Sequence, residues 1–159
     1  MAIVPNREQF LAYAQDERDG EVVMLNLLKF KDRVGEDGEA PDASANGNGT
    51  ARTGAEEYRR YSETVVGMVE AQGGRVVWVG RPEHVLIGDV AGDHWDLVAL
   101  VSYPSRRAFV EMVSQPAYQD AHRHREGGLE RSLLLGCEAL PVPGTAGTAG
   151  TPIGGADDD

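Results

Sequence analysis

The stretch EVVMLNLLKF at residues 21–30 constrains the fold most strongly, because it is typical of a β-strand that is apolar on both faces. Side chains alternate along a strand, so Asn26 shares one face with Met24 and Leu28, while Lys29 lies on the other. A strand of this kind belongs to a sheet that is covered on both faces. The carboxamide of Asn26 then needs a partner or a wet cavity, since leaving it dry and unpaired costs about 1–3 kcal/mol.

Hydrophobic periodicity along the rest of the chain predicts the order of the elements. Helical spacing is found at residues 7–17, 54–74, 105–115 and 116–128, and strand-like runs at 21–30, 75–88, 94–103 and 131–140. Asn6 and Ser105 are candidate N-caps, the strand-like run at 75–88 bends near Gly80 to Pro82, and the link DVAGD is short enough for a hairpin.

The order is a helix followed by βαββαβ, which predicts a ferredoxin-like α+β fold with an antiparallel four-stranded sheet and helices on one face. The other face has no cover within the chain, although it is mostly apolar. We therefore expect this face to pair with a second subunit or to enclose a ligand.

Composition sets the boundaries of the domain. The internal stretch at residues 33–54 and the tail at 141–159 are rich in Gly, Ala, Asp and Thr and offer little to bury. We expect a single domain over residues 1–140, a disordered tail after it, and an insertion at 33–54 that is either a mobile excursion or a lid over a site.

Charge and cysteine content limit the partners and the compartment. The formal net charge is -11, with 26 acidic against 15 basic side chains, which argues against binding to nucleic acid or to an anionic membrane. No apolar run approaches the roughly 20 residues of a membrane span. The single cysteine, Cys137, forms no intramolecular disulfide and suits a reducing compartment. We expect a cytoplasmic protein.

Aromatic residues at helical and strand positions are candidates for the walls of a pocket. Tyr58 and Tyr61 are three residues apart, so they share the helix face that turns toward the sheet. They are either core residues or the polar end of a binding pocket, because buried phenols need hydrogen-bond partners. Trp78 and Trp95 are either walls for a flat ligand or core and interface residues.

The stretch PAYQDAHRHREGG carries the side chains best suited to chemistry. Helical spacing places Tyr118, His122 and Arg125 on one face, whereas Glu126 is expected to point elsewhere and His124 toward solvent. Such a face can bind a carboxylate or enolate and move a proton, with Arg125 as a fixed charge and His122 as an acid or base. The alternative is an exposed basic helix end that offsets the helix dipole.

Metal and haem sites have weak support. His122 and His124 are two residues apart on a helix, which separates them by roughly 200°. His94 and Asp96 share a strand face but lack a third ligand. His122 or His84 would be the axial ligand of a haem, yet neither has a distinguishing context. We expect no cofactor and no metal.

Three segments together resemble the domain-of-unknown-function family 1330 within the dimeric α/β-barrel superfamily. They are VVMLNLLKF, YRRYSETVVGMVEAQGGRVVWVGRPEHVLIG and WDLVALVSYPSRRAFVEMVSQPAYQDAHRHR, and they span most of residues 19–140. The resemblance implies a homodimer with a pocket inside each subunit. The superfamily includes cofactor-free monooxygenases, haem-degrading enzymes, polyketide cyclases, isomerases and ligand binders, and fold alone does not choose among them. The N-terminal helix and the long insertion after Lys31 depart from shorter family members.

These observations lead to one hypothesis with alternatives. The protein binds a small aromatic or acidic organic molecule, and if it is an enzyme, His122 is the general base while Arg125 and Asn26 stabilise an oxyanion. The other expected ligand contacts are Lys29, Tyr58, Tyr61, Trp78, Trp95 and Tyr118. For Asn26 a structural clamp and for Lys29 a solvated rim position are the alternatives. The rival functions are a non-catalytic ligand sensor and a cofactor-free monooxygenase or cyclase.

Overall fold

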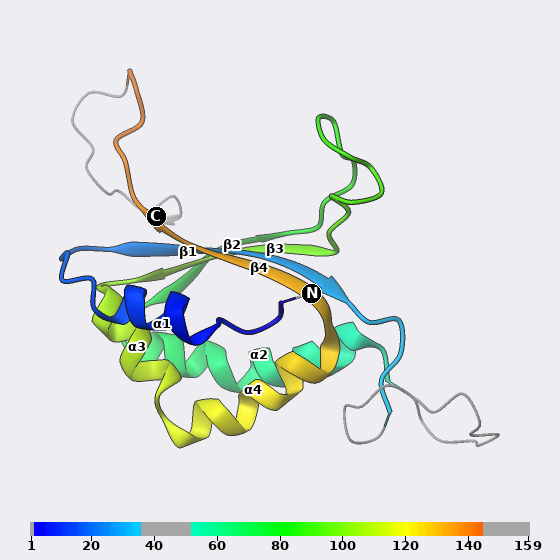
Figure 1. Cartoon of the computed structure of the whole chain (residues 1–159), viewed down its shortest axis with the longest axis horizontal. Coiled ribbons are helices and arrows are strands. Elements are labelled where there is room, and N and C mark those ends of the chain that lie inside the picture. Colours follow the sequence, from blue (N-terminus) through cyan, green and yellow to red (C-terminus); the bar gives the residue numbers. More distant parts are fainter. Residues whose placement is uncertain (1, 36–51, 145–159) are drawn as a thin grey trace, which may run out of the picture.

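The chain folds into a four-stranded antiparallel sheet with helices packed on one side (Figure 1). The structure is a computed structural model that describes residues 2–35 and 52–144. The strands are β1 (Val22–Phe30), β2 (Arg75–Gly80), β3 (Leu97–Tyr103) and β4 (Leu129–Glu138), in the spatial order β2-β3-β1-β4. The helices are α1 (Arg7–Ala14), α2 (Gly54–Ala71), α3 (Arg106–Val113) and α4 (Pro116–Gly128). The predicted ferredoxin-like α+β fold is confirmed.

Local capping fixes where the helices begin. The side chain of Asn6 accepts a hydrogen bond from Gln9 N at 2.8 Å, and Ser105 Oγ accepts one from Ala108 N at 3.1 Å, as their positions predict. Thr53 caps α2 through a reciprocal bond with Glu56, which the sequence reading did not single out. These caps satisfy backbone N–H groups that a helix leaves unpaired at its start.

The central strand β1 pairs with β3 on one side and with β4 on the other. Its alternation turns Val22, Met24 and Leu28 toward the helices, where each is buried, and thereby builds the sheet side of the core. A register shift between Lys29 and Phe30 ends the regular pairing with β4. The helix side of the sheet is therefore both the core and the only covered face of the described chain.

The predicted hairpin between residues 75–88 and 94–103 is wrong in its details. Strand β2 ends at Gly80, and residues 81–96 form a long connection to β3. Pro82 has no backbone N–H for a sheet ladder, which explains why pairing stops there. The connection exposes Leu86 and Ile87 almost completely and projects on the side of the sheet away from the helices (Figure 1).

The face of the sheet opposite the helices carries a row of apolar side chains. The register aligns Trp78 of β2 with Leu100 of β3, then with Leu25 of β1 and Leu135 of β4. Trp78 is 53% exposed and Leu135 is 44% exposed. Large apolar side chains in one row on an uncovered sheet are typical of a surface that meets a partner.

The ends of the predicted insertion meet at a short bridge. Val34 N donates to the Arg52 carbonyl at 2.8 Å, and Val34 is fully buried. The interior of the insertion at residues 36–51 and most of the tail at 141–159 lie outside the described residues, so the predicted mobility of both stays a prediction. Within residues 2–35 and 52–144, no helix is both long and apolar enough to cross a membrane.

Candidate functional site

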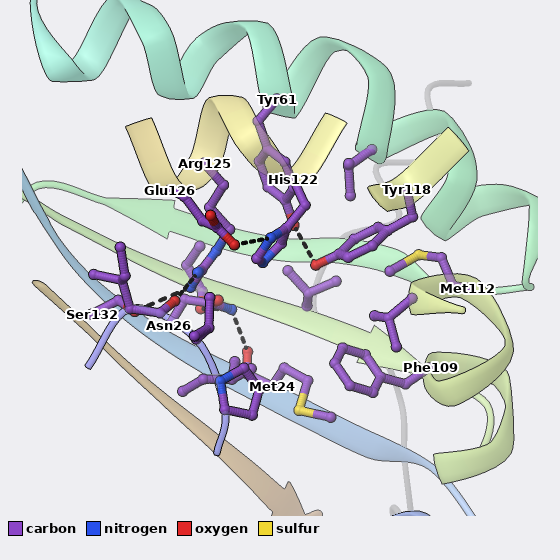
Figure 2. Close-up of a pocket in the computed structure, with 18 of the residues that line it drawn as sticks. Met24, Asn26, Tyr61, Phe109, Met112, Tyr118, His122, Arg125, Glu126 and Ser132 are labelled. Carbon is purple, nitrogen blue, oxygen red and sulfur yellow. Dashed lines mark hydrogen bonds and ion pairs between the residues drawn. The ribbon is translucent and has the colours of Figure 1, made fainter. Parts of the chain in front are cut away.

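A cavity of about 1130 Å³ lies between the helix side of the sheet and the helices. Six of the nine predicted site residues line it, and they come from β1, α2 and α4. These six are Asn26, Tyr58, Tyr61, Tyr118, His122 and Arg125. Figure 2 shows a polar end around Arg125, His122 and Asn26, and an apolar part around Phe109 and Met112. Such a cavity, mostly apolar with a few convergent polar groups, is typical of a small-molecule site.

A chain of aromatic rings forms one wall of the cavity. The ring centroids of Tyr58 and Tyr61 are 5.3 Å apart, and those of Tyr61 and Tyr118 are 6.1 Å apart. The hydroxyl groups of Tyr61 and Tyr118 share a hydrogen bond of 3.2 Å. Burial raises the pKa of all three phenols, that of Tyr58 to about 12, so they are neutral near pH 7. They therefore offer hydrogen bonds and ring faces to a ligand, and no negative charge.

His122 and Glu126 form a pair at the polar end. His122 Nδ1 lies 2.9 Å from Glu126 Oε1, one helical turn along α4. An Nδ1–H bonded to the carboxylate leaves Nε2 as the unprotonated nitrogen of a neutral imidazole. Burial and the neighbouring Arg125 lower the pKa of His122 below its ordinary value, although Glu126 opposes them. The imidazole is thus neutral and able to accept a proton at physiological pH.

Arg125 supplies a buried positive charge beside this pair. The residue is 6% exposed, its Nη1 donates to the Ile3 carbonyl at 2.5 Å, and its Nη2 donates to Ser132 Oγ at 3.2 Å. Neither acceptor is charged. Burial raises the pKa values of Tyr58 and Tyr118, and the positive charge of Arg125 lowers both by a smaller amount.

Asn26 faces the cavity, as strand alternation predicts. Its Nδ2 lies 3.3 Å from the Met24 carbonyl and 3.4 Å from the Ala99 carbonyl, two long hydrogen bonds to the sheet. These contacts orient the carboxamide so that its oxygen is left for the cavity, on the same side as Arg125 and Ser132 (Figure 2). The nitrogen of the Asn26 side chain therefore has a structural role in the sheet, while its oxygen remains available to a ligand.

Three residues that we expected to contact the ligand lie outside the cavity, namely Lys29, Trp78 and Trp95. Lys29 is on the opposite strand face and its Nζ lies 3.3 Å from Asp96 Oδ1. Trp95 precedes β3, where the Arg131 guanidinium stacks over its ring at 4.1 Å. Trp78 belongs to the apolar row on the open face. Residue type alone does not reveal which face an aromatic side chain occupies, and this explains the difference.

Sequence reasoning missed several polar residues of the cavity, among them Glu126, Ser132 and Tyr13. Glu126 was expected to point away from His122, but the i,i+4 spacing that joins them was present in the sequence. Ser132 is a β4 residue without a sequence signal. Tyr13 of α1 lines the cavity too, and its hydroxyl is buried with no hydrogen-bond partner among the described residues.

His124 is not directed to solvent as predicted. Its Nδ1 lies 2.5 Å from Oε1 of Glu57, a carboxylate that is buried between α2 and α4. Arg52 Nε donates to the other oxygen of Glu57 at 2.8 Å. Burial alone would raise the pKa of Glu57, but these two hydrogen bonds outweigh it and hold the pKa below its ordinary value. This cluster locks the two helices that carry the cavity residues.

Metal-binding groups are absent from the part of the chain that the structure describes: no three His, Cys, Asp or Glu side chains converge there. The polar groups that line the cavity are an imidazole already bonded to a carboxylate, together with phenols, amides, hydroxyls and guanidinium groups. This set suits an organic ligand that has both polar and aromatic parts.

Comparison with known proteins gives a family and a set of solved relatives. A sequence model described as "Domain of unknown function (DUF1330)" matches residues 50–136. A crystal structure of a protein of unknown function from Rhodopseudomonas palustris is 36% identical, with 88% of this chain and 98% of that chain covered and a TM-score of 0.76. A methylated form of that protein is 37% identical over 91% and 98% of the chains, also with a TM-score of 0.76.

A more distant structure has a related description. It is a dimeric protein of unknown function with a ferredoxin-like fold from Bacteroides fragilis, 13% identical over 76% of this chain and 97% of that chain, with a TM-score of 0.47. No protein with a curated description matches the chain.

Proposed function

Because the chain belongs to the family described as "Domain of unknown function (DUF1330)", whose description states no activity, we propose a function from the chemistry of the cavity. The protein binds a small aromatic or acidic organic molecule and catalyses a cofactor-independent proton transfer on it. The observation that carries this proposal is the His122–Glu126 pair, 2.9 Å apart, placed beside the buried cation Arg125 in a mostly apolar cavity.

Each polar group has a role in this reaction. The unprotonated Nε2 of His122 accepts the proton, because Glu126 holds the ring by its other nitrogen and a lowered pKa keeps the ring neutral. Removing a proton next to a carbonyl places negative charge on the carbonyl oxygen. Arg125 stabilises that oxyanion, and the tyrosine wall orients the ring of the substrate. Asn26 takes a different role from the one expected, because its Nδ2 donates to the Met24 and Ala99 carbonyls and its oxygen is left to accept a hydrogen bond from the substrate.

The proposal includes a homodimer formed through the open face of the sheet. Support comes from the apolar row of Trp78, Leu100, Leu25 and Leu135, which no part of the described chain covers. Two copies of one apolar surface meet in a closed, two-fold arrangement, which is the commonest symmetry of soluble oligomers. The cavity lies on the helix side of the sheet, so each subunit keeps its own site.

Proton transfer is testable without knowledge of the net reaction. Phenylpyruvate and its uncharged methyl ester both carry acidic C–H groups beside a carbonyl, and enzyme-catalysed removal of that proton in D₂O is visible by NMR as deuterium exchange. We expect the wild-type protein to accelerate exchange in at least one of the two probes, and His122→Ala to abolish the acceleration. The rate of general-base catalysis changes by about 10²–10⁴-fold on loss of the base.

The pH dependence and a control variant distinguish the rival functions. The rate falls on the acid side of the lowered pKa of His122, and this limb is missing in His122→Ala. Arg123→Ala on the exposed side of α4 keeps the wild-type rate. A ligand sensor binds the probes with similar affinity in wild type and His122→Ala and exchanges no proton. Oxygen uptake with a phenolic probe, in place of exchange, identifies the monooxygenase alternative.

A further inference from the structure

The charge of Arg125 has no counter-ion in the structure. Its two hydrogen bonds go to an uncharged carbonyl and an uncharged hydroxyl, and no carboxylate of the described residues lies within 4.0 Å of the guanidinium. The nearest acid in sequence, Glu126, is instead paired with His122. Arg125 as a residue is 6% exposed, and a charged side chain is costly to bury without an anion. An incoming anion is therefore the missing partner of this site.

The Ile3 carbonyl, which accepts the hydrogen bond from Arg125, belongs to a segment with few contacts to the rest of the protein. Residues 2–6 line the cavity and run along the sheet on its helix side before α1 (Figure 1). Two hydrogen bonds to backbone carbonyls hold the segment there: Arg125 Nη1 donates to the Ile3 carbonyl, and Ser132 N donates to the Ala2 carbonyl at a long 3.3 Å. Val4 is 44% exposed, and helix α1 has no buried residue. The segment has few contacts to lose when it moves.

The space next to Arg125 has a shape and chemistry that fit an aromatic group. The neighbouring rings of Tyr58, Tyr61 and Tyr118 line one wall of the cavity. Figure 2 shows Phe109 and Met112 in the apolar part beyond Tyr118. A carboxylate is planar and accepts two parallel hydrogen bonds from one guanidinium, which a single carbonyl oxygen cannot match. The anion and the ring belong to one molecule, because the guanidinium and the aromatic wall line the same cavity.

We propose that the ligand of this cavity is an aromatic carboxylate, whose carboxylate binds Arg125 in the place of the Ile3 carbonyl, and that residues 2–4 are a displaceable cover over this anion site. The inference rests on the proposed function, since it names the ligand class of the same cavity. It adds the anchor, the charge of the ligand and the segment that must move. Displacement of the cover also breaks the bond between Ser132 N and the Ala2 carbonyl.

The test uses 1-naphthoate and its uncharged counterpart 1-naphthamide as probes, with calorimetric titration of the full chain. We expect naphthoate to bind about tenfold or more tightly than naphthamide, and Arg125→Gln to remove this preference. Arg125→Lys keeps the charge without the planar fork, so it retains part of the preference and serves if Arg125→Gln does not fold. Arg123→Gln, on the exposed side of the same helix, binds both probes like the wild type.

Two further measurements test the cover. Deletion of residues 2–4 keeps the Asn6 cap and frees the guanidinium, so naphthoate binds about threefold or more tightly than to the wild type. Hydrogen exchange at the Ser132 amide accelerates when naphthoate binds and stays unchanged with naphthamide. Unchanged or weaker binding to the deletion variant, or an unaffected Ser132 amide in the naphthoate complex, overturns the cover.

The possible failures are separable from one another. Equal affinity for naphthoate and naphthamide overturns the carboxylate as the ligand class, while the cavity keeps its proposed role. Absence of His122-dependent deuterium exchange with both phenylpyruvate and its ester, in a protein that still prefers naphthoate to naphthamide, overturns the proton transfer alone and leaves the carboxylate site standing. Absence of binding by either naphthalene probe, in the wild type and in the deletion variant, overturns this inference as a whole.

Discussion

At the scale of single residues, the surroundings of His122 lower its affinity for a proton. Burial and then the charge of Arg125 lower the pKa below the ordinary 6.5, while the charge and hydrogen bond of Glu126 raise it. The folded protein therefore binds a proton at this site less readily than the unfolded chain. As the pH falls below 6.5, the unfolded chain binds a proton at His122 that the folded protein binds less readily. This site therefore lowers the free energy of unfolding at acidic pH and has no effect on it well above pH 6.5.

Replacing Glu126 tests how the His122 pKa is set. Glu126→Gln removes the negative charge that raises the pKa and leaves only a neutral hydrogen-bond acceptor, so we expect the pKa of His122 to fall further below 6.5. Titration of the His122 ring protons by NMR measures this value directly. Glu130→Gln removes an exposed carboxylate on the neighbouring strand and serves as the control. An unchanged or higher pKa in Glu126→Gln contradicts the pairing of the two side chains.

The same residues show what the sequence can and cannot reveal about a site. Helical spacing predicted that His122 and Arg125 lie together, because α4 is regular from Pro116 onward. The contact between Arg125 and Ile3 could not be predicted from the sequence, because the two residues are 122 positions apart and no local pattern links them. Trp78 was placed in the pocket by its size, but its ring lies against the backbone at Gly80 on the other side of the strand.

At the scale of elements, the cavity depends on a close contact between the start of α2 and the end of α4. Gly54 N donates to the Lys31 carbonyl and Lys31 N donates to the Gly128 carbonyl, each at 2.9 Å. A Cβ atom on Gly54 would lie 2.3 Å from the Gly128 oxygen and 2.5 Å from the Lys31 oxygen. Backbone atoms cannot move aside as a flexible side chain does, so a side chain at this position forces the helices apart.

Two glycines of α2 give a matched prediction. We expect Gly54→Ala to lower the free energy of unfolding by about 1–3 kcal/mol or more, because it overpacks the junction. Gly67→Ala in the same helix meets no atom within 4 Å, and we expect it to raise the free energy of unfolding by about 0.5–1 kcal/mol through helix propensity. Urea unfolding of both variants measures the difference. Equal effects of the two substitutions contradict the close contact.

The buried carboxylate of Glu57 is a second link between α2 and α4. We expect His124→Ala to lower the free energy of unfolding by about 1–3 kcal/mol, because it leaves one oxygen of a buried carboxylate without its donor. Arg123→Ala, the exposed neighbour, stays within about 0.5 kcal/mol of wild type. Urea unfolding near pH 7 checks both values. The pKa of Glu57 is lowered, so its stabilisation is present above about 4.5 and is lost as the pH falls further.

Element boundaries were predictable where a local signal existed. Asn6 and Ser105 marked two helix starts through their short polar side chains, and the last strand-like run matches β4 apart from its ends. The connection after Gly80 was misjudged because residues 83–88 contain apolar side chains that read as a strand. Leu86 and Ile87 are exposed in the structure, and sequence pattern alone does not distinguish an apolar strand from an apolar loop.

At the scale of the whole molecule, the two faces of the sheet differ in what covers them. One face forms the core and the cavity with the helices, while the other presents the row from Trp78 to Leu135. The long connection at residues 81–96 projects on this second side and exposes Leu86 and Ile87. A partner on the open face therefore meets both the apolar row and this projecting connection, and a second copy of the chain offers the same surface in return.

Substituting one residue of this row tests the proposed homodimer. Leu135→Asp places a charge in each subunit's contact surface, so a two-fold interface receives two of them, and we expect the dimer dissociation constant to rise about 100-fold or more. Leu11→Asp on α1 is the control, because Leu11 is 42% exposed and Leu135 is 44% exposed, yet α1 lies on the helix side. Sedimentation equilibrium measures the mass of each variant. Dissociation by Leu11→Asp with a persistent Leu135→Asp dimer would move the interface to the helix side of the sheet.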